Sequence, residues 1–201
     1  QYMIKRSEMQ KIVKSYSDIR IGVLGSHSAL EVMDGAKDEN LNTVVFCQKG
    51  RETPYQRFGR ISDEIMILRK FKDIATVSNQ KKLRDTNTLI VPHRSLTAYL
   101  GYNVIENTLK VPIFGNRALF QAEERNNKKN QYYLLKKAGI KYPKIFKNPK
   151  LINKPAIVKV QEKNRKLERA FFTVSSYSDF KKKSEEKIKN GMISRKDLNE
   201  S

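Results

Sequence analysis

Residues 21–51 read IGVLGSHSALEVMDGAKDENLNTVVFCQKGR, and this stretch decides the fold class. It begins with an apolar run that predicts a strand, breaks at Gly25, and continues with the spacing of an amphipathic helix over residues 27–39. A second apolar run follows at residues 42–48. Strands joined by a helix are parallel, because such a connection returns the chain to the same end of the sheet. We therefore predict an α/β protein built on a parallel sheet.

The same alternation continues as far as residue 115. The further predicted strands are residues 64–68, 87–92 and 111–115, the helices are residues 78–86 and 95–102, and a polar loop occupies residues 49–60. The apolar runs are nearly continuous, which indicates strands that are buried on both faces. We expect a Rossmann-like domain over residues 18–117, preceded by an N-terminal helix over residues 1–17.

The pattern changes after residue 117. Residues 118–140 predict one long connecting helix that stops at Gly139. The remaining predicted elements are an antiparallel hairpin over residues 156–160 and 170–176, and an amphipathic helix over residues 176–191. Residues 118–201 are thus expected to form a connecting helix and the first part of a second domain.

The composition excludes several classes of protein. The chain has 201 residues, of which 38% are hydrophobic and 31% are charged, so it can bury a core of ordinary size. Its apolar runs are far shorter than the roughly 18 residues that span a bilayer, so we expect no membrane partner. Cys47 is the only cysteine, which excludes an internal disulfide and favours the reducing cytoplasm.

The net charge of +20 is unevenly distributed. Residues 125–201 carry 22 Lys and Arg against 7 Asp and Glu, which gives this part a net charge of +15. Such a basic block indicates nucleic acid, an anionic ligand, or an acidic surface elsewhere in the same protein. The third explanation stays open because the sequence begins with Gln rather than Met, and we interpret it as a fragment of a longer chain.

The turn after the first strand has the chemistry of an anion site. Ligands of parallel sheets bind beyond the carboxyl ends of the strands, where free N–H groups and the helix dipole favour phosphate. Ser26, His27 and Ser28 add two hydroxyls and an imidazole at this place. The glycine-rich dinucleotide motif and the Walker motif are both absent. The alternative is that Ser26 or Ser28 caps the following helix and that His27 is an ordinary surface residue.

A second strand end carries similar residues. His93, Arg94 and Ser95 follow the predicted strand at residues 87–92 and begin the next helix. If the first and fourth strands are neighbours, His27 and Ser95 face one crevice. The cations able to meet a phosphate there are Arg94, Lys49 and Arg51. The two histidines and the single cysteine match no zinc pattern, so no metal site is predicted in this sequence.

Longer segments resemble one known family. In chain order they read GVLGSHSALEVMDGAKDE, CQKGRETPYQRF, IVPHRSLTAYLG, VPIFGNRALF and LLKKAGIKYPK. They are similar to the archaeal formate-dependent synthetase of 5-formaminoimidazole-4-carboxamide ribonucleotide (FAICAR), and the resemblance extends over residues 19–185. It implies a Rossmann-like N-terminal domain, a pre-ATP-grasp domain, followed by an ATP-grasp clamp around a nucleotide.

The resemblance also implies an activity and a substrate site. The family is a ligase that uses ATP, with Mg²⁺ or Mn²⁺, to activate formate as formyl phosphate. It then formylates 5-aminoimidazole-4-carboxamide ribonucleotide (AICAR) in purine (IMP) biosynthesis. His27 and Ser95 align with family positions that contact AICAR, and we include Ser26 and Arg94 beside them in the predicted substrate site. The metal ligands are expected beyond residue 201, and no catalytic residue is assigned.

An ATP site is implied in the second part of the chain. Lys159 aligns with the lysine that ATP-grasp proteins place against ATP phosphates, and the alternative is a solvated lysine at a strand end. The sequence departs from many family members here, because no glycine lies between Gln161 and Phe172. Lys163 and Arg165 are predicted to cover the phosphates by charge instead of by backbone N–H groups.

Two other classes of function stay open. The missing glycine loop is consistent with a non-catalytic nucleotide-binding homologue. A basic module for nucleic acid is suggested by aromatic residues among lysines, namely Tyr132, Tyr133, Phe171 and Phe172. We favour the ligase, with AICAR, formate and ATP as substrates, a homo-oligomeric state, no specific nucleic-acid partner, and no activity in the fragment alone.

Overall fold

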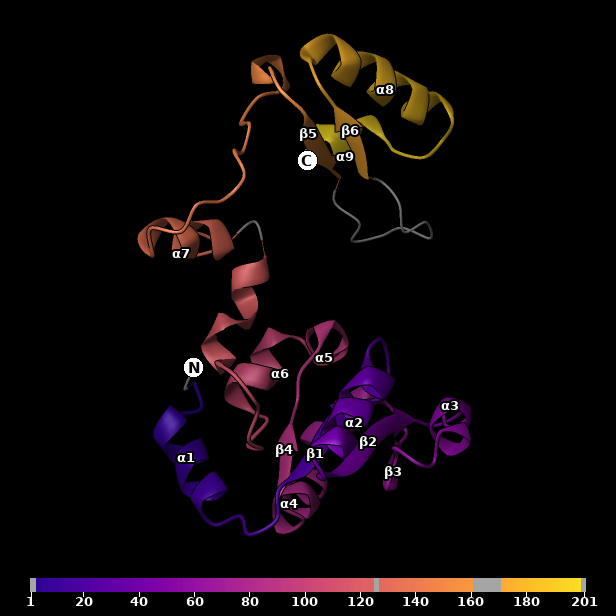
Figure 1. Cartoon of the computed structure of the whole chain (residues 1–201), viewed down its shortest axis with the longest axis vertical. Coiled ribbons are helices and arrows are strands. Elements are labelled where there is room, and N and C mark those ends of the chain that lie inside the picture. Colours follow the sequence, from indigo (N-terminus) through magenta and orange to yellow (C-terminus); the bar gives the residue numbers. More distant parts are fainter. Residues whose placement is uncertain (1–2, 125–126, 161–170, 200–201) are drawn as a thin grey trace. The chain divides into compact units, whose positions relative to one another are not determined.

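The computed structural model describes residues 3–124, 127–160 and 171–199. The chain, drawn in Figure 1, forms two compact units, Gln1–Gly139 and Ile140–Ser201. Each unit has its own hydrophobic core. This division falls later in the chain than the expected boundary at residue 118.

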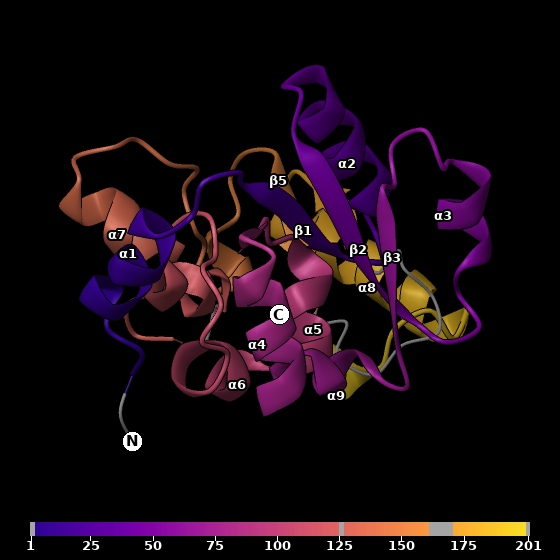
Figure 2. The ribbon, with the colours of Figure 1, turned by 90° about the horizontal axis from the view of Figure 1, so that it is seen from below.

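The first unit is built on a four-stranded parallel sheet with the strand order β3-β2-β1-β4. Its strands are β1 (Arg20–Leu24), β2 (Asn42–Gln48), β3 (Glu64–Leu68) and β4 (Thr88–Ile90). Figure 2 shows β1, β2 and β3 side by side. β1 also pairs with β4, so Gly22 lies between Val44 and Ile90. The predicted α/β class and the proximity of the first and fourth strands are confirmed.

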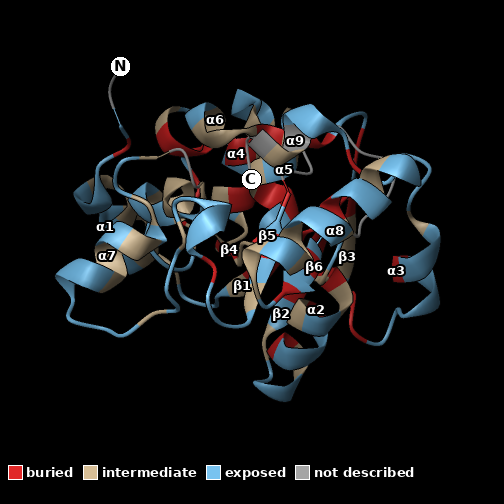
Figure 3. Cartoon of the chain, turned by 90° about the horizontal axis from the view of Figure 1, so that it is seen from above, coloured by how far each residue is buried: buried red, intermediate tan, exposed pale blue. Residues whose placement is uncertain are grey.

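Helices cover both faces of this sheet. They are α2 (Ala29–Asp38), α3 (Thr53–Arg57), the 3-10 helix η1 (Phe71–Ala75), α4 (Val77–Asp85), α5 (Arg94–Leu100) and α6 (Tyr102–Asn107), with α1 (Arg6–Lys14) before the first strand. In β2, Val44 and Phe46 pack on the side of η1, α4, α5 and α6, whereas Val45 and Cys47 pack on the side of α2 and α3. Figure 3 marks the buried residues in red. The apolar strands of this sheet are therefore buried on both faces, as predicted.

Gly22 is required at the centre of β1 by close packing. A Cβ atom at this position would lie 2.5 Å from Cζ of Phe46 and 2.6 Å from Cγ2 of Thr88. Phe46 and Thr88 are both fully buried, so neither side chain has free space to move into. The neighbouring strands thus fill the volume that a side chain at residue 22 would occupy.

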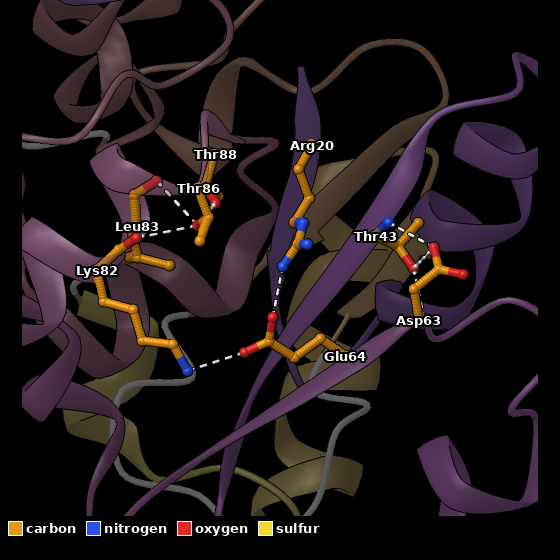
Figure 4. Close-up of polar contacts among 8 residues, drawn as sticks. All are labelled: Arg20, Thr43, Asp63, Glu64, Lys82, Leu83, Thr86 and Thr88. Carbon is orange, nitrogen blue, oxygen red and sulfur yellow. Dashed lines mark hydrogen bonds and ion pairs between the residues drawn. The ribbon is translucent and has the colours of Figure 1, made fainter. Parts of the chain in front are cut away.

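An ionic network joins the amino ends of the strands, opposite the edge at which ligands bind in such sheets. Figure 4 shows Glu64 between Arg20 and Lys82, and Asp63 beside Thr43. Lys82 Nζ donates to Glu64 at 2.9 Å, and the backbone N–H of Thr43 donates to Asp63 at 2.8 Å. The hydrogen bond from Lys82 lowers the pKa of Glu64. The network fixes the ends of β1, β2 and β3 relative to one another.

Two predictions for this unit are wrong. Residues 111–115 form no strand, because only Ile113 makes an isolated parallel bridge, to Ile90. The preceding residue is a proline and has no N–H group to donate to a longer ladder. The predicted loop over residues 49–60 contains α3, and Pro54 lies in the first turn of this helix, where proline is favoured.

The predicted long helix over residues 118–140 is also wrong. The structure has a 3-10 helix, η2 (Arg117–Glu123), and a separate helix, α7 (Gln131–Lys137). Asn130 separates them, because its side chain accepts hydrogen bonds at 3.1 Å from two free N–H groups in the first turn of α7. The prediction that Gly139 ends the helix is confirmed, since Gly139 has a φ of 69° just past α7.

Arg117 explains why the start of η2 groups with the first unit. Its guanidinium donates to the carbonyl oxygens of Ile105, Leu109 and Val111, the last two at 2.8 and 2.7 Å. Burial lowers the pKa of Arg117 to about 10. The side chain thus satisfies carbonyl groups at and after the end of α6.

The second unit is a small hairpin covered by helices. It consists of the 3-10 helix η3 (Pro149–Leu151), β5 (Ala156–Lys159), β6 (Phe171–Val174), α8 (Tyr177–Lys189) and α9 (Arg195–Asn199). β5 and β6 are antiparallel, and Ser176 caps α8 by accepting from the N–H of Asp179 at 3.1 Å, so the predicted hairpin and helix are confirmed. The core residues are Ile152, Val158, Val160, Phe172, Val174 and Ile193. Among the described residues, no helix of either unit has the length and apolar character needed to cross a membrane.

Candidate functional site

The candidate site lies at the carboxyl edge of the parallel sheet. Ser26 follows β1, Arg51 follows β2, and Ser95 lies at the start of α5, which follows β4. At Gly25 the first of these turns passes close to the backbone of β2. A Cβ atom at this position would lie 3.1 Å from the carbonyl oxygen of Phe46. Three chain segments that are distant in sequence therefore present polar side chains at one edge.

Ser26 and Ser95 join two of these segments directly. Ser95 Oγ donates to Ser26 Oγ at 3.2 Å. Ser95 is buried and Ser26 is half-buried, so this contact is partly shielded from solvent. The structure therefore brings together two residues of the predicted substrate site. We call Ser26 and Ser95 the serine cluster.

His93 is a structural clamp between the same segments. Its Nε2 lies 2.8 Å from the carbonyl oxygen of Leu24, and a carbonyl only accepts, so Nε2 carries the proton. Nδ1 then accepts the N–H of Ser95 at 3.2 Å and caps α5. Burial lowers the pKa of His93, which favours this neutral form. Both ring nitrogens are thus engaged by the backbone.

His27 lies in a different environment from His93. It is exposed, and its backbone has a φ of 46°, a left-handed conformation that few residues other than glycine adopt. Its Nδ1 lies 2.5 Å from Ser28 Oγ, and its ring stacks 6.0 Å from the ring of His93. No partner of Nε2 is found in the part of the chain that the structure describes. This nitrogen is available to a ligand.

The alternative interpretation of the first turn is partly wrong. Ser28 occupies the N-cap position of α2, but its side chain makes no capping hydrogen bond. Its hydroxyl contacts His27 instead. Ser26 does not cap α2 either, because its hydroxyl bonds with Ser95.

Tyr99 was not identified from the sequence, and it connects Arg51 to the cluster. The Arg51 Nη1 atom donates to the Tyr99 hydroxyl at 3.2 Å. The guanidinium also lies 5.6 Å from the ring centroid of Phe71 and 5.9 Å from that of Tyr99. The pKa of Tyr99 is lowered, first by the hydrogen bond from Arg51 and also by Ser26. The i, i+4 spacing from Ser95 to Tyr99 could have revealed this residue, since it places both on one face of α5.

Arg94 is engaged outside the serine cluster. Its Nη1 atom pairs with Glu123 at 2.8 Å and its Nη2 atom lies 4.0 Å from Glu124. Two carboxylates thus compensate its charge. Lys49, the other predicted cation, is exposed at the end of β2.

Lys159 is placed on the exposed side of the hairpin in the second unit. Its side chain is exposed, and Nζ lies 6.0 Å from the ring centroid of Phe171 on the paired strand. Lys163 and Arg165 lie outside the described residues. Within residues 3–124, 127–160 and 171–199, no group of three or more His, Cys, Asp or Glu side chains could hold a metal ion.

The fold and the cluster define a class: an α/β protein with a candidate ligand site at the carboxyl edge of a parallel sheet. Residues 21–146 match the family described as "Protein of unknown function (DUF1246)". The match covers more than half of the chain, and the chain belongs to this family.

Curated relatives carry a more specific name. Proteins named 5-formaminoimidazole-4-carboxamide-1-(beta)-D-ribofuranosyl 5'-monophosphate synthetase are similar to 98% of this chain, with 41% identity in Methanopyrus kandleri and 36% in Methanocaldococcus jannaschii. The chain spans about half the length of these relatives, 54% in both cases. The resemblance to the synthetase family is confirmed by these names. A solved structure of the IMP biosynthesis protein PurP from Thermococcus kodakaraensis matches 74% of this chain and 41% of that chain, with a TM-score of 0.49 and 25% identity.

Proposed function

We propose that this chain is part of an ATP- and formate-dependent ligase that converts AICAR to FAICAR in purine biosynthesis. The observation that carries the proposal is the 41% identity, over 98% of the chain, to a relative named as this synthetase. The proposed chemistry has two steps. Formate attacks the terminal phosphate of ATP to give formyl phosphate and ADP, and the AICAR amine then attacks the formyl carbon with loss of phosphate.

The carboxyl edge of the sheet is the proposed AICAR site. Ser26 and Ser95 supply hydroxyls that are already in contact, and His27 presents Nε2 beside them. Arg94 was predicted to meet the phosphate, but its charge is compensated by Glu123 and Glu124. Arg51 is the better candidate for this contact, because its charged group is exposed at the same edge.

The second unit is the proposed beginning of an ATP-grasp domain, after a Rossmann-like first unit. An exposed Lys159 on a strand fits a contact with ATP phosphates, and Lys163 and Arg165 in the following segment are proposed to add charge. The Mg²⁺ or Mn²⁺ ligands are proposed to lie outside the described residues. A homo-oligomeric state and a cytoplasmic location are part of the same proposal.

The test is ADP formation by the full-length protein. ATP, Mg²⁺, formate and AICAR are supplied together, and then formate or AICAR is omitted in turn. The ligase predicts ADP only in the complete mixture. AICAR binding without ADP formation under any condition would instead support the non-catalytic homologue. Binding to single-stranded nucleic acid that weakens steeply with salt would support the basic module.

A further inference from the structure

Arg51 is an exposed arginine whose side chain is nevertheless held in place. One hydrogen bond to the Tyr99 hydroxyl and the rings of Phe71 and Tyr99 restrain it, and those two rings are themselves in contact at a centroid distance of 4.5 Å. An unrestrained arginine loses side-chain entropy when a ligand fixes it. Arg51 has already lost part of this freedom before any ligand binds.

Tyr99 is the residue that contacts this arginine from the helix that carries Ser95. It lies one helical turn after Ser95 on α5, so both side chains leave the same face of the helix. Ser95 contacts Ser26, and Ser26 in turn influences the Tyr99 hydroxyl. Tyr99 therefore contacts Arg51 directly and shares one face of α5 with Ser95.

We propose that Tyr99 is a positioning residue that holds Arg51 where it receives the 5'-phosphate of the bound ribonucleotide. This inference rests on the proposed function, because it assumes that AICAR binds at the carboxyl edge of the sheet. Only one guanidinium N–H group is used by Tyr99, and a guanidinium has five. The remaining donors allow the paired hydrogen bonds that arginine makes with phosphate. The ring contacts hold the guanidinium beside Phe71 and Tyr99, while the residue as a whole stays exposed.

The test compares a ribonucleotide with its nucleoside in the full-length protein. Dissociation constants are measured for AICAR, for its nucleoside without phosphate, and for ATP. The variant is Tyr99→Phe, which removes the hydroxyl and keeps the ring against Phe71. The matched control is Tyr102→Phe, which removes a hydroxyl that bonds with Glu124 at 2.6 Å. Thermal unfolding establishes that both variants are folded.

We expect Tyr99→Phe to weaken AICAR binding about tenfold, the size of one lost hydrogen bond to a charged group. Nucleoside and ATP binding stay within about twofold of the wild type, as do all three constants in Tyr102→Phe. In an Arg51→Met background, Tyr99→Phe has no further effect, because the two residues act through one contact.

Other outcomes overturn the inference. Equal losses for AICAR and its nucleoside would show that Tyr99 contacts the base or sugar, or supports the fold. A loss confined to ATP would assign the phosphate near Arg51 to the other nucleotide. A wild-type protein that binds AICAR no better than its nucleoside would contradict the role of Arg51. A wild type that binds neither compound would contradict the proposed function itself.

Discussion

At the scale of single residues, the two histidines show how environment divides one residue type into two roles. His93 is half-buried, and the backbone engages both of its nitrogens, so it fixes the positions of β1 and α5. His27 is exposed in a left-handed turn, with Nε2 directed to no residue that the structure describes. Only His27 has an atom to offer to a ligand.

Replacement of His27 is expected to weaken AICAR binding and leave the fold intact. His27→Ala and His27→Asn should each raise the dissociation constant about tenfold, because each removes one ligand hydrogen bond. The Asn variant is the stricter test, since asparagine tolerates the left-handed φ of 46° better than alanine. Isothermal titration measures the affinity. Asn40→Ala, at a second left-handed position outside the site, is the control for backbone strain. Unchanged affinity in both His27 variants would exclude this residue from the site.

The sequence could predict that Ser26 and Ser95 lie close together, but it could not predict the contact between Tyr99 and Arg51. Because β1 and β4 are neighbours, the turn after β1 lies beside the start of α5, where Ser95 contacts Ser26. An aromatic residue in a short amphipathic helix is ordinary core material, and Tyr99 does pack against Phe71. Its contact with Arg51 depends on where the chain goes after β2, and local spacing does not reveal this path.

At the scale of elements, the packing of β1 requires a residue without a side chain at position 22. Gly22 has no side chain because Phe46 and Thr88 from both neighbouring strands occupy the space above it. The apolar runs made β1, β2 and β3 predictable, since their alternate residues face two cores. The break between η2 and α7 was not predictable in the same way. A single asparagine is compatible with a helix interior, and only the structure shows that Asn130 caps α7.

Gly22→Ala is expected to lower the free energy of unfolding by about 1–3 kcal/mol or more, as overpacking of a filled core does. The matched control is Gly35→Ala in α2, where an added Cβ atom meets nothing within 4 Å. This second change should raise the free energy of unfolding by about 0.5–1 kcal/mol, because alanine favours a helix over glycine. Urea unfolding of both variants measures the two effects. Equal effects in the two variants would contradict the packing argument.

The network at the amino ends predicts an acid-dependent loss of stability. The hydrogen bond from Lys82 lowers the pKa of Glu64 in the folded state. For Asp63, burial raises the pKa, but hydrogen bonds from Lys37 and Thr43 outweigh it, and the pKa is also lowered. Each carboxylate therefore stabilises the fold above its unfolded pKa, roughly 4, and loses this contribution as the pH falls through its folded pKa.

The expected size is modest because both carboxylates are about one-third exposed. Glu64→Gln should lower the free energy of unfolding at pH 7 by about 0.5–1 kcal/mol, and this difference from the wild type should shrink toward pH 3. Urea unfolding at a series of pH values measures it. A difference that is independent of pH would mean that the charge of Glu64 makes no contribution.

At the scale of the whole molecule, the charge is concentrated in one unit. Residues 140–201 carry 17 Lys and Arg against 7 Asp and Glu. Several lysines lie over aromatic rings within this unit, as Lys181 does over Tyr177 at 5.0 Å and Lys187 over Phe172 at 5.6 Å. In these contacts the lysine ammonium groups interact with aromatic rings of the same unit. In the proposed ligase, other basic side chains of this unit would attract the anionic substrates. The sequence predicted two parts, with the second beginning at residue 118, and the two compact units of the structure meet at residues 139 and 140.

The most direct test of the proposed ligase follows the carbon atom of formate. The full-length protein is supplied with ¹³C-formate, ATP, Mg²⁺ and AICAR, and both ADP and the mass of the product are measured. The ligase predicts FAICAR with a single ¹³C label in its formyl group, formed in equal amount to ADP. ADP without labelled FAICAR, or FAICAR without the label, would contradict the assignment.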